Sequence, residues 1–233
     1  MLLLALDTAT PAVTVALHDG QRVLASRDQV DARRHGELLL PSVDATLAEA
    51  GCALADVTGI VVGVGPGPYT GLRVGLVTAA SFAAALGVPV HGLCTLDGIA
   101  HAAARAGVAG GAGAPFVVAT DARRKEVYWA TYLADGRTRE GDPAVDRPAD
   151  IAERVAGVPA VGAGAVLYPE TFTGLRTGGP EHVTAGALAA LAAEKLAAGE
   201  ELLPPRPLYL RRPDAKVPAG YKAVTPRQAV GDR

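Results

Sequence analysis

A glycine- and proline-rich segment is the part of this sequence best suited to chemistry. Its residues are Gly63-Val64-Gly65-Pro66-Gly67-Pro68-Tyr69-Thr70-Gly71-Leu72-Arg73-Val74-Gly75. Glycines let backbone N–H groups point at a phosphate, and the N-terminus of a following helix adds positive potential. The spacing matches neither the P-loop nor the dinucleotide fingerprint, because no Lys-Ser/Thr follows Gly71 and no G-x-G-x-x-G occurs. A phosphate site and a simple tight turn therefore stay open as alternatives.

Asp7 ends a short apolar stretch and begins the polar turn Asp7-Thr8-Ala9-Thr10. Such an acid can handle a metal ion or a phosphate, but Ala9 stands where a glycine would let the backbone close on a phosphate. We therefore favour a structural Asp7 that accepts hydrogen bonds from turn N–H groups. The alternative is a weak nucleotide or anion contact through Asp7, Thr8, Gly65, Gly67 and Arg73. Arg73 is included because a cation in the first turn of a helix opposes the dipole and needs a compensating anion or carboxylate.

The remaining reactive side chains do not form a recognisable site. None of the three serines lies in a G-x-S-x-G elbow. Cys94 has no histidine placed as its base, so we interpret it as a small buried thiol. No two of the five histidines are spaced i, i+3 or i+4, so no helical metal site is encoded. We expect no catalytic residues and no metal ligands.

Hydrophobic periodicity predicts the elements that would position these residues. In the first half we expect strands at Leu2–Leu6, Val13–Leu17, Arg22–Arg27, Ile60–Val62 and Val88–Leu93, and helices at His35–Ala50, Leu72–Leu86 and Leu96–Arg105. Gly51 should end the first helix, and Thr70 should cap the second. The order β-β-β-α-β-α-β-α is that of the RNase-H-like half of the actin, Hsp70 and sugar-kinase (ASKHA) superfamily. We therefore predict an α/β fold with such a domain over residues 1–108.

The second half repeats this plan less clearly. Gly107–Pro115 is rich in glycine and is the expected domain junction. Beyond it we expect strands at Phe116–Thr120, Glu126–Leu133 and Ala160–Gly162, and helices at Pro148–Ala156 and Ala185–Ala198. Residues 109–203 are therefore predicted to form a second, reduced RNase-H-like domain, with residues 136–180 left undetermined. Residues 204–233 hold six prolines and should form an extended, partly disordered tail.

Composition and charge limit the classes of function. Apolar residues make up 49% of the chain, charged ones 20%, and the formal net charge is −2. These values indicate a folded protein and argue against tight unaided binding to nucleic acid. The tail is basic, with seven Lys or Arg against two Asp; a solvated tail is the favoured interpretation and an RNA-binding tail the alternative. Leu2–Leu6 is too short for a signal peptide or membrane span, and the two cysteines form no CxxC, so we expect a cytoplasmic protein.

Two predicted helices carry more apolar surface than one sheet can cover. In segments 35–50 and 71–87, apolar and small residues occupy more than one helical face, and alanines allow close approach. A contact with another chain and a well-covered internal core explain this equally well. The interface hypothesis assigns the contact to Leu38, Leu39, Ser42, Leu72, Leu76, Ala79, Ala80 and Ala83.

Five segments resemble the bacterial TsaB (YeaZ) family. They are Leu4–Thr10, His35–Pro41, Gly65–Gly75, Asp121–Tyr128 and Pro207–Arg211. The resemblance covers most of residues 1–133 and is patchy afterwards; the glycine-proline motif with Gly71-Leu72-Arg73-Val74-Gly75 is its most specific part.

The resemblance implies a non-catalytic partner subunit. Proteins of this family assist the transferase TsaD, with the ATPase TsaE, in forming N6-threonylcarbamoyladenosine at position 37 of tRNAs that read codons beginning with A. It implies docking to TsaD, or to a second copy, through the two helices above, tRNA engaged only through the complex, no membrane, and no cofactor beyond ATP or ADP at the complex interface. TsaD itself has an H-x-x-x-H metal pair; the corresponding positions here are Thr95 and Ile99, which are not metal ligands of that kind.

Other functions are kept as alternatives. The first is a small ATP-dependent phosphotransferase that uses Asp7 and the glycine-rich turn. A peptidase is disfavoured, because the chain has neither a metal pair nor a serine elbow. In the third alternative, the basic tail (residues 204–233) is an independent RNA-binding module.

Overall fold

The computed structural model describes residues 1–109 and 113–211. The first half contains β1 (Leu3–Asp7), β2 (Ala12–His18), β3 (Val23–Val30), α1 (His35–Ala50), η1 (Leu54–Asp56), β4 (Gly59–Gly63), α2 (Tyr69–Leu86), β5 (Val90–Leu93) and α3 (Thr95–Arg105). The second half contains β6 (Phe116–Asp121), β7 (Val127–Tyr132), β8 (Arg139–Asp146), α4 (Pro148–Val155), β9 (Pro159–Val161), α5 (Ala163–Leu167), β10 (Gly174–Leu175) and α6 (Ala185–Ala197).

The two halves share one topology. The first sheet has the strand order β3-β2-β1-β4-β5, and the second has the same order, β8-β7-β6-β9-β10. In each, three antiparallel strands are followed by two that join parallel to the first strand. Helices follow the third, fourth and fifth strands of both halves. This duplicated arrangement confirms the predicted pair of RNase-H-like units.

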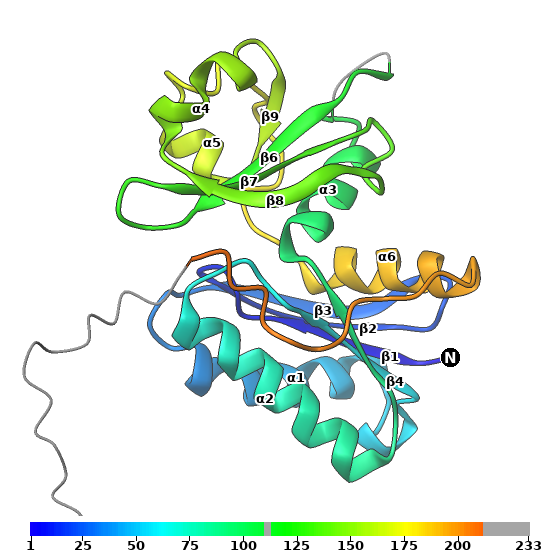
Figure 1. The fold of residues 1–233 in the computed structure, drawn as a ribbon. Helices are drawn as coiled ribbons and strands as arrows, with labels where there is room; N and C mark the ends of the chain where they lie inside the picture. The colour runs from blue at the N-terminus through cyan, green and yellow to red at the C-terminus, as the bar shows by residue number, and fades with distance from the viewer. Residues whose placement is uncertain (110–112, 212–233) are drawn as a thin grey trace, which may run out of the picture.

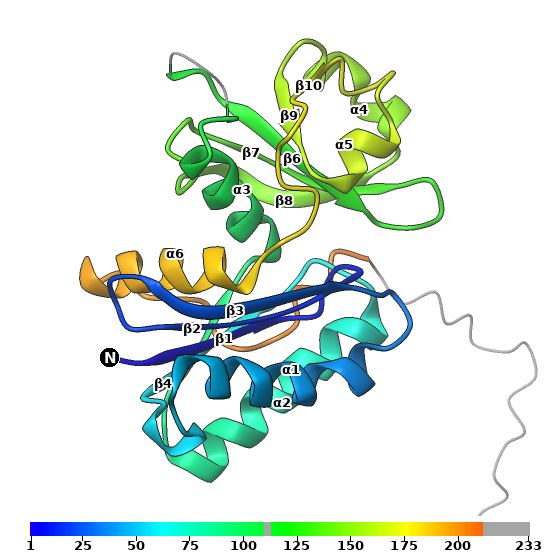
Figure 2. The ribbon, with the colours of Figure 1, turned by 180° about the vertical axis from the view of Figure 1, so that it is seen from behind.

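The elements stack in five layers (Figures 1 and 2). Helices α1 and α2 cover the outer face of the first sheet, and α4 and α5 cover the outer face of the second. Between the sheets lie α3 and α6. All residues of β1 are buried, because Leu4 and Leu6 face α1 and α2 while Leu3 and Ala5 face the inner helices.

The inner layer joins the two halves through one core. Residues of both sheets, of α3 and of α6 belong to a single buried cluster that includes Val61, Ile99, Phe116 and Leu188. Helix α6 follows the second sheet along the chain but packs on the strands of the first. The predicted unit 109–203 therefore describes the sequence repeat, whereas the packed body that contains the first sheet also includes α6.

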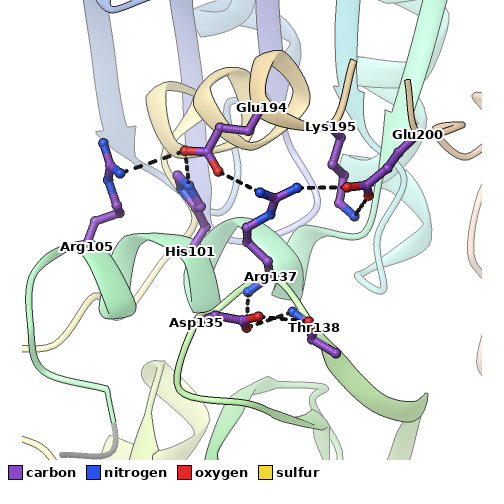
Figure 3. Close-up of polar contacts among 8 residues, drawn as sticks. All are labelled: His101, Arg105, Asp135, Arg137, Thr138, Glu194, Lys195 and Glu200. Carbon is purple, nitrogen blue, oxygen red and sulfur yellow. Dashed lines mark hydrogen bonds and ion pairs between the residues drawn. The ribbon is translucent and has the colours of Figure 1, made fainter. Parts of the chain in front are cut away.

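A network of charged groups links the same elements (Figure 3). Glu194 of α6 accepts a hydrogen bond from His101 of α3 at 3.2 Å and lies 3.7 Å from Arg137, in the turn between β7 and β8. Arg137 also binds Glu200 at 2.9 Å, and Asp135 orders the turn by accepting from the N–H groups of Arg137 and Thr138. Since exposed ion pairs contribute about 0–1 kcal/mol each, the network orients the halves while the shared apolar core holds them together.

The segment after α6 returns to the first sheet instead of leaving the fold at residue 204. Gly92 and Leu203 form a bridge with two backbone hydrogen bonds, and the N–H of Leu208 donates to the carbonyl of Val64. Residues 204–211 are thus strapped along the first unit, as the orange segment in Figure 1 shows. The predicted tail beyond residue 211 lies outside the described residues, as does part of the predicted domain junction.

Most predicted elements are confirmed within a few residues. Gly51 ends α1 in the left-handed conformation, as expected. The predicted cap at Thr70 is wrong, because α2 already begins at Tyr69 and its N-cap position, Pro68, makes no side-chain cap hydrogen bond. Elements β8, α5 and β10 were not predicted. Of these, α5 and β10 have only five and two residues, too few to show a hydrophobic period.

Candidate functional site

The glycine segment, the end of β1 and the start of α3 meet at one end of the first sheet. Asp7 is fully buried, and its carboxylate accepts the N–H of Ala9 and the hydroxyl of Thr95, each at 2.7 Å. The Thr95 hydroxyl also accepts the N–H of Gly65 at 3.2 Å, while the carbonyl of Gly65 accepts the N–H of Thr95. These bonds are the kind that the structural interpretation of Asp7 expects, and the N–H of Gly65 is bound within the chain.

Burial dominates the electrostatics of Asp7. Because the carboxylate is removed from water, its pKa rises from 3.8 to about 6, although the hydrogen bonds from Thr95 and Ala9 oppose the shift. Burial likewise raises the pKa of the Cys94 thiol, which fits the predicted inert thiol.

Thr8 connects β1 to the first turns of α2. Its buried hydroxyl donates to the carbonyl of Gly71 at 2.7 Å and accepts the N–H of Gly75 at 2.9 Å. These are the two groups that an α-helix would normally join to each other. Thr8 therefore inserts into the helix ladder and fixes the position of α2 on the sheet.

The glycines of the motif make room for this contact. A Cβ on Gly63 would lie 1.6 Å from the carboxylate of Asp7, and one on Gly67 would lie 2.0 Å from the carbonyl of Ala9. On Gly71 and Gly75 it would lie 2.7 Å from the carbonyl and the hydroxyl of Thr8, respectively. The motif is thus a tight turn pressed onto residues 7–9, and of the two alternatives drawn from the sequence the geometry favours the turn.

Two cavities flank this turn. One of about 200 Å³ is lined by Thr8, Thr10, His35, Gly71 and Arg123, among others. The other, of about 490 Å³, lies between Gly67–Tyr69, the turn after β6, and Tyr209–Arg211. Of the five candidate anion contacts, Thr8 lines the first cavity and Gly67 the second, whereas Asp7, Gly65 and Arg73 line neither.

Arg73 has a partner that the sequence did not suggest. Its guanidinium lies 4.3 Å from the centre of the Tyr69 ring, which stacks on Tyr209 with ring centres 5.5 Å apart. The quadrupole of the tyrosine ring thus attracts the cation where we expected an anion or a carboxylate. The sequence does not predict the contact between Tyr209 and Tyr69, because the two residues lie 140 positions apart and Tyr209 belongs to no periodic element.

The proposed interface residues are largely internal. Leu39, Ser42, Leu72, Leu76, Ala79 and Ala83 are buried against the chain's own sheet. Only Ala80 is exposed, and Leu38 is half-buried. The sequence could not separate the sheet-facing side from the outer side, because both sides of α2 are apolar. The outer side of α2 is mostly apolar or small, with Leu40 exposed on the neighbouring α1; its exposed residues are Tyr69, Thr70, Arg73, Val77, Ala80, Ser81, Ala84 and Ala85.

The metal and nucleophile candidates have structural roles. No group of three or more His, Cys, Asp or Glu that could hold a metal ion occurs among residues 1–109 and 113–211. Thr95 is bound to Asp7, and Ile99 is fully buried in the shared core. His35 contacts the carbonyl of Thr10 at 2.8 Å and so braces the start of α1.

Comparisons with known proteins agree on one family. The family profile described as "TsaD: tRNA N6-adenosine threonylcarbamoyltransferase" matches residues 23–177. An uncharacterized protein of Mycobacterium tuberculosis is 46% identical over 221 residues, covering 91% of this chain and 93% of that protein. The tRNA threonylcarbamoyladenosine biosynthesis protein TsaB of Escherichia coli is 39% identical over 136 residues, covering 58% of this chain and 56% of that protein. The structure of YeaZ from Pseudomonas aeruginosa superimposes with a TM-score of 0.75 at 32% identity, covering 90% of this chain and 99% of that one.

The close approach of α2 to Thr8 predicts a large effect of one methyl group. Gly71→Ala should lower the free energy of unfolding by about 1–3 kcal/mol, because its Cβ meets the backbone carbonyl of Thr8. Gly36→Ala, near the start of α1, is the matched control: its Cβ has open space, so it should leave stability unchanged or raise it by up to about 1 kcal/mol. Urea denaturation measures both; equal stabilities would contradict the packing described here.

The raised pKa of Asp7 predicts a specific pH dependence. Well below pH 3.8 the carboxyl is neutral in both the folded and unfolded chain, whereas above about pH 6 the folded chain must bury a charge. Relative to Asp7→Asn, the natural chain should therefore lose about 2 kcal/mol of stability as the pH rises from about 4 to 7. Asp44→Asn, an exposed position on α1, controls for the loss of a negative charge. If the difference in unfolding free energy between the natural chain and Asp7→Asn did not change with pH, the result would be inconsistent with a buried Asp7 carboxylate.

Proposed function

The chain belongs to the family that the TsaD profile describes, and within it to the TsaB (YeaZ) proteins; from this premise we propose that it is a non-catalytic subunit of the machinery that makes threonylcarbamoyladenosine in tRNA. It acts in the cytoplasm by docking to a TsaD-type transferase, which carries out the transfer with a TsaE-type ATPase. The tRNA is the substrate of the assembled complex.

The residues at the two positions that correspond to the TsaD metal pair, Thr95 and Ile99, support an inactive subunit. The hydroxyl of Thr95 donates a hydrogen bond to Asp7, and the side chain of Ile99 is buried in the core between the sheets. Neither side chain is an imidazole, carboxylate or thiolate, the usual ligands of catalytic iron or zinc. Asp7, the acid that the alternative phosphotransferase would need, is fully buried and hydrogen-bonded within the turn.

The outer side of α2 is the observation that carries the docking proposal. Arg73 is the single charged residue among the 18 residues of this helix. Val77 is 64% exposed, and Leu40 on the neighbouring α1 is 50% exposed. A solvent-facing helix normally carries charged residues on its outer side, so an apolar outer side suits a covered interface.

Helix α2 is also long and apolar enough, by length and composition alone, to cross a membrane. Its inner side is occupied, however: Leu72, Leu76 and Ala79 are buried against the first sheet. The helix is therefore part of this folded layer, and we assign its outer side to a protein partner. A transferase with a related fold could present its own pair of helices to it, and a second copy of this chain could do the same.

Docking would act by shifting a population. If the partner has two conformations and only the active one binds this surface tightly, docking raises the fraction of partner molecules in the active conformation. The size of this shift is limited by the ratio of the two binding affinities. ATP or ADP at the subunit boundary fits the same scheme, as a ligand of the assembly and not of this chain alone.

Charge placed on the outer side of α2 should weaken the assembly without unfolding the chain. Val77→Arg and Ala80→Arg are expected to reduce association with a matching TsaD by at least about tenfold, because each buries an unpaired cation in the contact. Ala197→Arg, at an exposed position near the end of α6, is the matched control and should associate normally. Sedimentation velocity measures association, and threonylcarbamoyl transfer to tRNA measures function.

The same transfer assay separates the subunit role from an enzyme. Transfer that requires both TsaD and this chain, and none by this chain alone, is the expected result. Full activity of TsaD without this chain, or association unchanged by both arginine variants, would contradict the proposed role.

A further inference from the structure

The cavity of about 490 Å³ brings together three segments that lie far apart in the sequence. Its walls are Gly67–Tyr69 before α2, Ala122–Arg124 with Tyr128 around the β6–β7 turn, and Tyr209–Arg211 of the strapped terminal segment. The cavity therefore lies where the first unit, the second unit and the last described residues meet. Neither the buried Asp7 nor the outer side of α1 belongs to it.

Aromatic rings form one side of the cavity. Tyr69 and Tyr209 stack with their planes inclined by 25°, and they remain 54% and 46% exposed. The guanidinium of Arg73 lies over the Tyr69 ring, and that of Arg211 lies 6.0 Å from the Tyr128 ring. Exposed, rigid tyrosine rings next to guanidinium groups are the surface on which unpaired bases stack.

Positive charge forms the other side. Arg123, Arg124 and Lys125 are exposed on the β6–β7 turn, and all three have left-handed φ angles, of 61°, 56° and 60°. Arg211 braces this turn by donating to the carbonyl of Arg123 at 3.1 Å and pairing with Glu126. Left-handed φ angles at three successive non-glycine residues strain the backbone. Such a conformation is kept only where the surrounding contacts impose it.

The local charge is opposite in sign to that of the whole chain. The residues that line the cavity include three cations, Arg123, Arg124 and Arg211, and no carboxylate. Two of these cations pair with a neighbouring carboxylate, Arg123 with Asp121 and Arg211 with Glu126, so these five groups together carry a charge of +1, whereas the chain as a whole carries −2. Beyond Arg211 the sequence continues with five more Lys or Arg and two Asp up to residue 233.

We propose that this cavity binds an unpaired stretch of RNA. A base stacks on the exposed Tyr69–Tyr209 pair, and the neighbouring phosphates lie against Arg123 and its turn. A paired duplex does not fit, because its bases are not free to stack on the rings.

A free nucleotide suits the site less well than a strand. Nucleotide phosphates are usually held by converging backbone N–H groups at a helix start, and here the glycine turn is packed onto residues 7–9. The charged side chains of Arg123, Arg124 and Arg211 instead line the cavity. This RNA contact belongs to the chain itself, in contrast to the expectation that tRNA is held only through the complex, and it does not depend on the proposed partner.

Fluorescence anisotropy with a labelled single-stranded RNA of about ten nucleotides tests this assignment on the full chain without a partner. We expect salt-sensitive binding that Tyr209→Ala weakens about tenfold, because one stacked base is lost, and that Tyr209→Phe retains. Arg123→Glu should weaken binding and lower the slope of affinity against salt by about one. Arg154→Ala is the matched control: Arg154 also stacks on an aromatic ring, Trp129, at 4.7 Å, but outside the cavity. It should bind RNA normally.

Several results would overturn the assignment. No binding at low salt, or equal binding by Tyr209→Ala and Arg154→Ala, would remove the cavity from RNA recognition. Binding of ADP that Arg123→Glu abolishes, with no binding of the RNA, would assign the cavity to free nucleotide. If Arg212→Gln with Lys216→Gln removed RNA binding while Tyr209→Ala did not change it, the terminal sequence alone would be responsible. Thermal unfolding of every variant checks that the fold is retained.

Discussion

The close packing of a glycine turn onto the end of β1 is the contact on which the first unit depends. Glycines at four-residue intervals from Gly63 to Gly75 leave no space for a side chain next to residues 7–9. Within this contact, Thr8 takes over a hydrogen bond of α2. The position of α2 is thereby fixed at its first turns, and with it the direction in which its outer side faces. Any partner that binds α2 uses a surface whose orientation is set by this contact.

The same contact occupies polar groups that a phosphate site at this motif would need. A cradle needs backbone N–H groups that converge on open space. In this chain the N–H of Gly65 is bound to Thr95, the N–H of Ala9 is bound to Asp7, and the Asp7 carboxylate is buried. The polar groups that could have bound a ligand instead join the end of β1, the glycine turn and the start of α3 to one another. Such a use of polar groups suits a subunit that provides a surface for others.

The surfaces left open are connected to one another. Tyr69 begins α2, so it belongs to the outer side of that helix and, through its stacking on Tyr209, to the cavity between the units. A transferase docked on α2 would therefore lie beside an RNA strand held at that cavity. The relative position of the two units matters for this arrangement, and it is fixed by the shared core and by the contacts of Glu194 with α3 and with the β7–β8 turn.

The sequence by itself determined the local elements and their order. Alternation in the strands, Gly51 at the end of α1 and the β-β-β-α-β-α-β-α order predicted the duplicated α/β fold, because these signals act over a few residues. The presence of Ala9, where a phosphate-binding turn would need glycine, also favoured a structural role for Asp7. Tertiary structure decided what depends on distance: which side of α2 is outer, that α6 packs on the sheet of the other half, and that Tyr69, Arg123 and Tyr209 meet. An apolar helix with two similar sides, and residues more than 50 positions apart, carry no local signal for these contacts, since only the packing of the whole chain brings them about.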